Sequence, residues 1–309
     1  MSKKSYFGVN GVARNVKSWP VGIGNVARKA KSGYFGVGGV ARQFLSGVDP
    51  VLNNNDWATI RAVSDANQGA NYWSVGDTKT ITINGKVGKT TFSNLSVDAF
   101  ILGFNHNSSR EGANRIHFQI GKINGTLVGL VDGNYGNYTS TTGAFTMNTS
   151  NTNSGGWNNS HMRKTVLGSN SASATSPTAN TLLAALPSDL RAVMKSVTKY
   201  TDNTGNASNV SGNVTATSDY LFLLAEFEVK GSRTYANSYE QNSQAQYDYF
   251  KAGNSKIAYR HTATGTVVWW WLRSADCNLS DLFCYVHTDG KAYSYYAGYS
   301  GGVLPGFAV

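Results

Sequence analysis

Side chains suited to ligand recognition are concentrated between residues 276 and 300 of the 309-residue chain. Five of the 17 tyrosines lie in this stretch. Along Tyr285–Tyr295, bulky polar side chains occupy the odd positions and small side chains the even positions. In a strand with a period of two residues, this alternation places the bulky groups on one face. Tyr combined with Ser, Asp and Asn is typical of recognition surfaces, because its ring provides a large contact area at a low rotamer cost. The alternative is a Tyr-rich surface that faces solvent and binds nothing.

Two carboxylates have a spacing that could serve catalysis. Glu226 and Glu228 lie two residues apart in a predicted strand, where they could act together on a sugar polymer. A pair in this position more commonly binds backbone amides or an arginine. No G-x-S-x-G motif stands in a strand–turn–helix context. We therefore predict that the protein is not an enzyme.

The cysteines and histidines indicate neither a reactive site nor a metal site. Cys277 and Cys284 are seven residues apart, and we expect buried structural thiols there. The five histidines lack the spacing of metal ligands. The segment 132–137 resembles a calcium loop only superficially, because it lacks the required register and the terminal Glu. The sequence therefore predicts no metal and no cofactor.

Two arginines stand near tryptophans and are expected to be structural. Arg163 follows Trp157, and Arg273 follows the triple tryptophan 269–271. A guanidinium there could stack on an indole, or it could bind a carboxylate such as Glu226.

The elements that must position these residues predict a mixed α+β fold with long loops. We expect a short helix capped by Asn55 and ending near Gly69. A second helix should begin at Pro187, with an apolar stripe from Leu186 to Val197. Predicted strands cover 78–84, parts of 96–105 and 115–120, 220–229 and 267–273, and Asn84-Gly85 is a hairpin signal. Residues 132–156, 168–180 and 201–218 are predicted loops, and short strands should alternate with Gly turns from Phe283 onward.

The first 47 residues contain a repeat with a period of 14 residues. Its three units are Tyr6–Arg14, Pro20–Arg28 and Tyr34–Arg42. Each unit places a turn pair between short apolar stretches, namely Asn10-Gly11, Gly24-Asn25 and Gly38-Gly39. This pattern predicts tight β-hairpins. Two units also fit G-x-G-x-x-A, but no helix follows as nucleotide binding requires, so we favour the turn interpretation. We define domains at 1–47 and 48–309.

The positive charge of the chain belongs to this repeat module. The formal net charge is +10, and residues 1–47 hold eight basic side chains and no acid. The remaining residues carry 19 basic and 17 acidic groups, a net of only +2. The module could contact nucleic acid or an anionic polymer, dock into an acidic protein socket, or face solvent. Its Val, Ala, Tyr and Phe content favours docking against protein, and no nucleic-acid motif is present.

Composition excludes several other classes of protein. Charged residues make up 14% of the chain, against about 25% in ordinary soluble domains. The longest apolar runs, Tyr220–Ala225 and Val267–Leu272, are far shorter than the roughly 20 residues that span a bilayer. The basic start lacks a following apolar region, so no signal peptide is predicted. We expect a β-rich globular protein without membrane insertion.

Several motifs resemble one family of phage-associated proteins from gut bacteria. They are Trp57-Ala-Thr-Ile60, Tyr72-Trp-Ser-Val-Gly-Asp77, Ile101-Leu-Gly-Phe-Asn-His106, Gly156-Trp-Asn-Asn-Ser-His-Met-Arg163, Trp270-Trp-Leu-Arg-Ser274 and Gly302-Val-Leu-Pro-Gly-Phe307. The last two resemble the ending of the formylglycine-generating-enzyme type of C-type lectin fold. The resemblance covers residues 50–309 and implies a C-type-lectin-like domain behind the hairpin module. The Val-Ala-Arg repeats also resemble leaders found on such proteins.

Some members with this ending are targets of diversity-generating retroelements, which randomise adenines in a template. The resemblance therefore implies a diversified, ligand-binding surface at 276–300. Its candidate residues are Asp276, Asn278, Ser280, Asp281, Tyr285, His287, Asp289, Lys291, Tyr293, Tyr295, Tyr296 and Tyr299. All of them except Lys291 have codons that are Asn or one adenine change away from Asn, and Lys291 lies on the same predicted face. Between them, Phe283, Val286, Gly290, Ala292 and Ala297 should stay fixed for packing.

The resemblance implies a receptor-binding or adhesin protein of a phage tail. It would be made in the bacterial cytoplasm and carried in the virion. Residues 1–47 would attach it to tail proteins, and the 276–300 surface would bind a host-surface protein or glycan. A homotrimer is compatible with this role, and nucleic acid is not an expected partner. The alternatives are a structural virion protein whose Tyr-rich face serves assembly and, third, a surface-polysaccharide hydrolase on the same fold.

Overall fold

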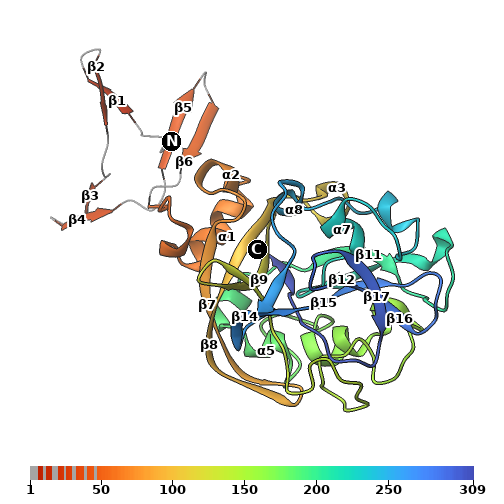
Figure 1. Cartoon of the computed structure of the whole chain (residues 1–309). Helices are drawn as coiled ribbons and strands as arrows, with labels where there is room; N and C mark the ends of the chain where they lie inside the picture. The colour runs from red at the N-terminus through yellow and green to blue at the C-terminus, as the bar shows by residue number, and fades with distance from the viewer. Residues whose placement is uncertain are drawn as a thin grey trace.

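The computed structural model describes residues 47–309 in full and, of the preceding residues, the backbone of six strands. These strands are β1 (Tyr6–Val9), β2 (Val12–Asn15), β3 (Pro20–Ile23), β4 (Val26–Lys29), β5 (Gly33–Val37) and β6 (Val40–Phe44). Each consecutive pair is antiparallel and forms a separate two-stranded sheet (Figure 1). The innermost partners are equivalent in each repeat, Val9↔Val12, Ile23↔Val26 and Val37↔Val40. This is the pairing that the repeat predicts, whereas the turn pairs lie outside the described residues.

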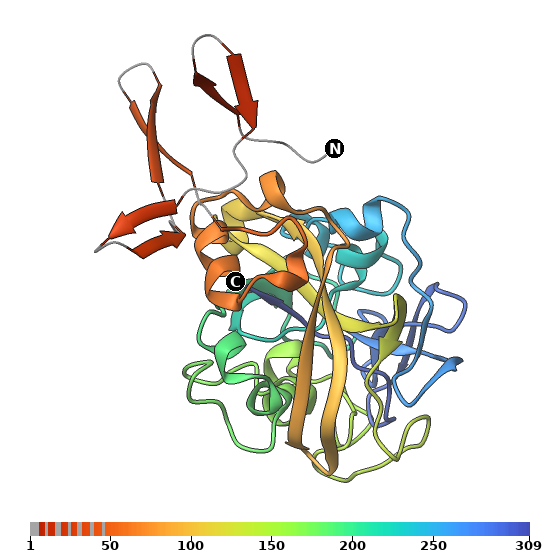
Figure 2. The same ribbon diagram turned by 90° about the vertical axis from the view of Figure 1, so that its left-hand side faces the viewer.

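A seven-stranded sheet forms the frame of the main body. Its order is β14-β13-β10-β9-β8-β7, and β18 pairs with β9. The bounds are β7 (Thr78–Val87), β8 (Thr90–Phe104), β9 (Ile116–Ile123), β10 (Thr126–Gly129), β13 (Ala258–Arg260), β14 (Ala263–Val268) and β18 (Gly306–Ala308). All pairs are antiparallel except β10 with β13. The long β7–β8 hairpin, orange and yellow in Figure 2, runs along one side of the body.

Helix α1 (Trp57–Asp65) covers the centre of this sheet with the apolar face that the sequence predicts. The ring of Trp57 packs edge-on against Phe118 of β9 at 5.5 Å and Phe307 of β18 at 5.9 Å. The helix cap differs from the prediction, because Asp56 accepts the Thr59 amide. The predicted cap, Asn55, donates its side-chain amide to preceding carbonyls instead. The helix also ends at Asp65, before a separate short helix α2 (Gly69–Tyr72).

The predicted helix after Pro187 is wrong. Only α6 (Ser188–Arg191) forms, and the chain then enters strand β11 (Val197–Asp202), which pairs with β12 (Val214–Asp219). Apolar residues of this segment are buried both in α6 and in β11. Pairing with β12 and the buried partners of Lys199 outweigh the local helical pattern.

Two further expectations are overturned. Residues 220–225 form no strand, and α7 (Glu226–Lys230) follows them. They are a buried loop whose backbone pairs with single residues, as in the reciprocal bonds between Phe222 and Gly306. Gly85 lies at a bulge within β7, where its φ is 131°. The β7–β8 turn comes later, at Gly88, because a positive φ there suits glycine.

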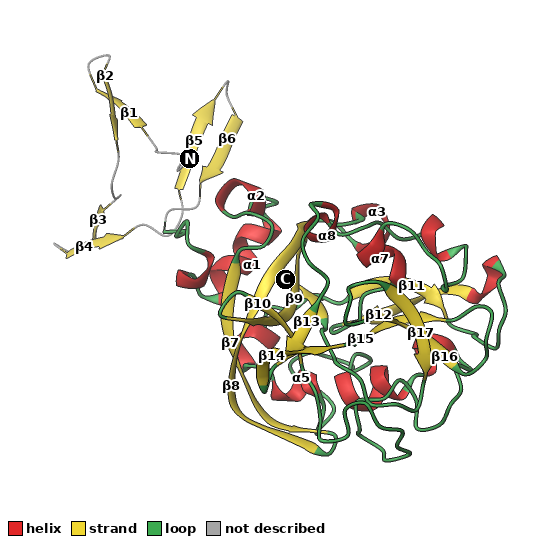
Figure 3. Cartoon of the chain, viewed as in Figure 1, coloured by secondary structure: helices red, strands yellow, loops and turns green. Residues whose placement is uncertain are grey.

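A separate three-stranded antiparallel sheet is formed by the residues between β14 and β18 of this frame, and it carries the C-terminal recognition segment. Its strands are β15 (Trp270–Ala275), β16 (Leu282–Val286) and β17 (Ala292–Tyr296). Loops and one-turn helices fill the region around it (Figure 3). The remaining elements are η1 (Leu52–Asn54), α3 (Ser108–Glu111), α4 (Gly156–Asn159), η2 (Met162–Leu167), α5 (Leu182–Ala185), η3 (Ser211–Asn213), η4 (Glu240–Asn242) and α8 (Asp248–Lys251).

The fold is thus mixed α and β, with sheet predominating. The predicted loops 132–156 and 168–180 contain turns and isolated bridges, and only Gly156 begins a helix, α4. The predicted loop 201–218 is wrong in part, because it contains the end of β11, η3 and most of β12. Among the described residues, no helix has the length and apolar character needed to cross a membrane. The C-type-lectin-like assignment stays a prediction.

Candidate binding surface

The three-stranded sheet places aromatic rings side by side on one face. Trp271 of β15 pairs with Tyr285 of β16, and Tyr285 pairs with Tyr293 of β17. Directly paired residues in a sheet point to the same side. Tyr295 lies two residues beyond Tyr293 and therefore shares that side. The odd-position alternation in the sequence correctly predicts that Tyr285, Tyr293 and Tyr295 share a face.

We call this face the aromatic surface, defined by Trp269, Tyr285, Tyr293, Tyr295 and Tyr299. Its rings contact one another in a continuous series. Their centroid distances are 5.3 Å for Trp269–Tyr285, 5.5 Å for Trp269–Tyr295, 6.2 Å for Tyr285–Tyr293, 5.8 Å for Tyr285–Tyr295 and 4.9 Å for Tyr295–Tyr299. All five side chains are partly exposed. Each ring is thus held by its neighbours while part of it remains available to a ligand.

The opposite face of the sheet anchors the aromatic surface to the core. Cys284 and Val286, at even positions of β16, are completely buried. Phe283, which pairs with Tyr295 and so lies on the side of the aromatic surface, is also completely buried, as is Ala297, and the sequence predicts both to be fixed for packing. Gly290 and Ala292 are half-buried. A rigid base of this kind lowers the entropy lost on binding.

The turn between β16 and β17 forms a charged tip beside the rings. The ring of His287 lies 5.4 Å from that of Tyr293, and its Nδ1 is 3.2 Å from the Asp289 carboxylate. The Lys291 amide donates to the same carboxylate at 2.9 Å. That hydrogen bond, with His287 and Lys291 nearby, lowers the pKa of Asp289. The tip therefore presents a negative and a positive side chain in water, next to the aromatic surface.

Asp276, at the start of the candidate segment, is buried, contrary to the prediction that it binds a ligand. Asp276 is only 1% exposed, and its Oδ1 accepts the amides of Asn278 and Leu279. It therefore shapes a turn and cannot contact a ligand. Asn278 and Ser280 are exposed, and Asp281 is half-buried. Tyr296 is 43% exposed, at the end of β17.

A buried asparagine from the preceding loop holds this segment in place. The Asn153 side chain is completely buried. Its Nδ2 donates to the carbonyl oxygens of Asp276, Leu279 and Leu282 at 2.7–3.0 Å. The loop before β16 is therefore fixed by a residue more than a hundred positions away, which no local pattern could indicate.

Sequence reasoning missed three tyrosines that border the aromatic surface. Tyr235 lies 6.3 Å from Tyr293, Tyr138 lies 5.8 Å from Tyr299, and Tyr135 lies 5.7 Å from Trp269. The Tyr135 hydroxyl also accepts the Trp269 amide at 3.0 Å. All three come from loops without periodicity. Their position is set by long-range contacts alone.

The crowded hydroxyls remain protonated. Burial, followed by the neighbouring Tyr295 and Tyr293, raises the pKa of Tyr285 to about 12. Burial likewise raises the pKa values of Tyr295 and Tyr235. At neutral pH these phenols can both donate and accept hydrogen bonds, which suits polar ligands.

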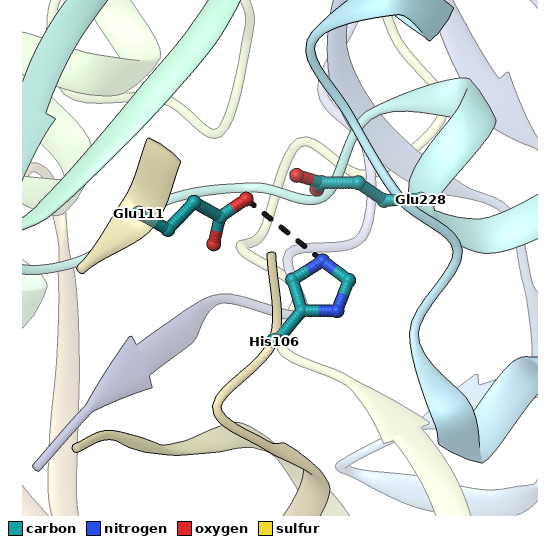
Figure 4. A group of neighbouring side chains, drawn as sticks. All are labelled: His106, Glu111 and Glu228. Atoms are coloured by element: carbon teal, nitrogen blue, oxygen red, sulfur yellow. Dashed lines mark ion pairs between the residues drawn. The ribbon is translucent and has the colours of Figure 1, made fainter. Parts of the chain in front are cut away.

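A second cluster, completely internal, gathers the titratable groups that could suggest a metal. His106, Glu111 and Glu228 offer ligand atoms within 4.8 Å of one another (Figure 4). Lys199, however, places its Nζ 2.8 Å from Glu111 and 3.1 Å from Glu228. Arg273 contacts the other Glu228 oxygen and donates to both. Two internal cations already balance the two carboxylates, so a divalent ion does not fit there.

The histidines of this cluster stay neutral. Burial, and then the nearby Lys199, lowers the pKa of His106 to about 3. Burial also lowers the pKa of His117, whose Nδ1 lies 3.0 Å from the Tyr247 hydroxyl. Burial raises the pKa of Glu111 to about 7, against the opposing effect of Lys199. The cluster joins α3, β9, β11, α7 and β15, and its role is structural.

The candidate catalytic pair does not face solvent. Glu226 and Glu228 are on a helix and not on a strand, and each is at most 1% exposed. Glu226 accepts the amides of Thr234, Tyr235 and Ala236. Glu228 pairs with Arg273, whereas the carboxylate named from the sequence, Glu226, lies two residues earlier. These carboxylates therefore bind backbone and arginine, the commoner outcome.

The other structural predictions agree with the geometry. Arg163 binds the Asp219 carboxylate at 2.7 Å, and the Trp157 indole donates to the same group. Cys277 and Cys284 are free and buried. Burial raises the pKa of both thiols, which disfavours the reactive thiolate.

Comparison with known proteins gives one match. No curated protein and no solved structure matches the chain. A family model described as a domain of unknown function, DUF6273, matches residues 138–309. That range is more than half of the chain and includes the whole three-stranded sheet with its aromatic surface. The chain therefore belongs to the DUF6273 family.

Proposed function

We propose that the protein is a receptor-binding protein or adhesin that binds a host-surface ligand through the aromatic surface. One observation carries the proposal. Five aromatic side chains that contact one another stay partly exposed on a sheet whose middle strand, β16, is anchored on its other face by the completely buried Cys284 and Val286. A contiguous group of partly exposed aromatic rings is typical of a surface that binds a partner.

The architecture suits recognition by aromatic contacts. Tyr and Trp are the residues that dominate binding energy at interfaces, and they lose little entropy when immobilised. Here the rings are already held by their neighbours and by Asn153 at the base of the segment. The charged tip adds Asp289 and Lys291 at the edge, where such groups contribute orientation more than affinity.

The proposal includes the assignments that the sequence resemblance suggests. The protein would belong to a phage tail, with a C-type-lectin-like domain that presents a diversified segment. The hairpin module 1–47 would attach it to other tail proteins, and several copies would combine weak contacts by avidity.

A triple variant tests the proposed function. Tyr293, Tyr295 and Tyr296 are replaced by Ala, and adsorption of the whole protein to a panel of gut bacterial strains is measured. Loss of hot-spot aromatic residues should weaken binding by about 30-fold or more. Tyr239→Ala is the matched control, because Tyr239 is 42% exposed, like Tyr296 at 43%. Within the described residues, no ring contact joins Tyr239 to the aromatic surface.

Retained adsorption by the triple variant would contradict the proposal. If the variant also failed to enter assembled virions, the result would favour the structural virion protein. Circular dichroism of each variant shows whether the fold is retained.

A further inference from the structure

A cavity of about 410 Å³ lies next to the aromatic surface. It is formed by the first residues of β8, the loop after β10 and the turn between β13 and β14. Its volume falls within the range of about 300–1,000 Å³ that small-molecule sites occupy. Tyr135 lines the cavity and contacts Trp269 of the aromatic surface. The cavity nevertheless has its own set of polar groups, which the proposed function does not use.

An arginine without a carboxylate partner lines this cavity. The Arg260 guanidinium lies over the Tyr135 ring, 4.4 Å from its centroid. Its Nε is buried and has no hydrogen-bond partner. Within the described part of the chain, no acidic oxygen lies within ion-pair distance of Arg260. A partly buried guanidinium without an internal acid can pair with the carboxylate of a ligand, because its planar fork matches carboxylate geometry.

The other polar side chains of the cavity are suited to hydroxyl groups. Thr90, Thr91 and Thr262 also line the cavity, and a threonine hydroxyl can donate and accept a hydrogen bond. The Nδ1 of His261 accepts the Val131 amide at 3.2 Å, which leaves the ring hydrogen on Nε2. Burial lowers the pKa of His261, so the ring stays neutral.

One acid lines the cavity, and its oxygens are already used. Asp132 Oδ1 accepts the Asn134 amide at 2.9 Å and the Ser300 hydroxyl at 2.6 Å. Its Oδ2 accepts the Phe145 amide at 2.8 Å. The Asp132 charge is thus held by donors of the chain, and it leaves Arg260 available.

We propose that this cavity binds a carboxylate-bearing sugar unit. Arg260 pairs with the carboxylate, while the threonine hydroxyls and the His261 Nε2–H bind the ring hydroxyls. A polyhydroxylated acid fits better than a simple carboxylic acid, because an apolar remainder would leave these hydroxyls without partners. A hexuronic acid and a sialic acid share this chemistry. The inference stands independently of the aromatic surface.

Titration calorimetry on the full chain tests the cavity with four probes: glucuronate, N-acetylneuraminate, glucose and acetate. We expect saturable binding of at least one sugar acid with a Kd below about 10 mM, and at least about tenfold weaker binding of glucose and acetate. Raising the salt concentration should weaken binding of the acid, because the pair with Arg260 is partly exposed. Equal affinities for the acid and for glucose, or an affinity independent of salt, would overturn the proposal.

Variants then assign the site. Arg260→Gln removes the charge and should weaken binding of the sugar acid about tenfold or more. Arg110→Gln is the matched control, because the Arg110 guanidinium also lies over a tyrosine ring, 5.3 Å from Tyr200. Unchanged affinity in Arg260→Gln, or no saturable binding in the parent protein, would refute the proposal. If Arg260→Gln does not fold, the salt dependence and the glucose comparison still decide.

The two sites can fail separately. The triple tyrosine variant should lose cell adsorption and keep its affinity for the sugar acid. Arg260→Gln should lose affinity for the sugar acid in the calorimetric assay and keep its adsorption to cells. The failure of one proposal is therefore distinguishable from the failure of the other.

Discussion

Replacement of Lys199 by Met should reveal how strongly the internal cluster stabilises the fold. Lys199 is completely buried, and its Nζ donates to Glu111 at 2.8 Å, Glu228 at 3.1 Å and the Tyr247 hydroxyl at 2.8 Å. With Lys199 and Arg273 present, two positive charges balance two carboxylates. The variant leaves one buried carboxylate without a cation. Removing one partner of a buried ion pair costs about 3–5 kcal/mol of unfolding free energy.

The loss should depend on pH, because Glu111 can accept a proton. Burial raises the pKa of Glu111 to about 7, above its usual 4.5, and removal of Lys199 raises it further. A carboxyl group with a raised folded-state pKa contributes stability that is present below the unfolded pKa and is lost as pH rises toward the folded pKa. The difference between parent and variant should therefore be larger at about pH 8 than at about pH 6.

Urea unfolding at both pH values measures the effect. The double variant Lys199→Met/Glu111→Gln should recover part of the loss at the higher pH, because no uncompensated charge remains. Lys164→Met is the control, since Lys164 is exposed and bonds only to the Asn159 side chain; its cost should stay within about 0.5 kcal/mol. A loss below about 1 kcal/mol for Lys199→Met, the value of an exposed ion pair, would refute the reasoning. A double variant Lys199→Met/Glu111→Gln that is less stable than Lys199→Met at the higher pH would refute it as well.

Three further predictions concern positions that support the fold and the aromatic surface. Burial raises the pKa of Glu240 to about 7 from 4.5. As pH rises from about 4.5 to about 7, the unfolding free energy of the parent should therefore fall by about 3 kcal/mol relative to that of Glu240→Gln, which chemical unfolding measures. Asn153→Ala leaves three carbonyl oxygens without their donor and should lower the unfolding free energy by about 1–3 kcal/mol. A protease should then cut the 276–282 loop faster than in the parent, and an unchanged cleavage rate would contradict this. Gly301→Ala brings a Cβ within 2.3 Å of the Trp269 ring, so we expect the unfolding free energy to fall by about 1–3 kcal/mol and the tryptophan fluorescence to change. An unchanged fluorescence spectrum would contradict the tight packing.

Elements with strong local signals were predictable from the sequence. The repeats predict the three N-terminal hairpins, because a turn pair between apolar stretches needs no distant partner. The alternation along Tyr285–Tyr295 predicts a shared face, because side chains of a strand alternate by geometry. The stripe of α1 predicts the helix face that packs on the sheet.

Elements with weak local signals were decided by tertiary contacts. The segment after Pro187 has helical spacing, but only α6 is helical and the chain then enters β11, because pairing with β12 and the partners of Lys199 favour the strand. The apolar run 220–225 resembles a strand, yet it is a buried loop whose backbone bonds to separate elements. In both cases long-range hydrogen bonds outweigh preferences that are small for each residue.

The sequence by itself determined the types of residue at the candidate binding surface, and the tertiary structure decided which of them a ligand can reach. Asp276 matches the pattern of the variable positions but is buried, because its carboxylate closes a turn. Tyr135, Tyr138 and Tyr235 carry no local signal but border the rings. Exposure depends on which distant loops cover a position, and a pattern along the chain contains only the order of the residues.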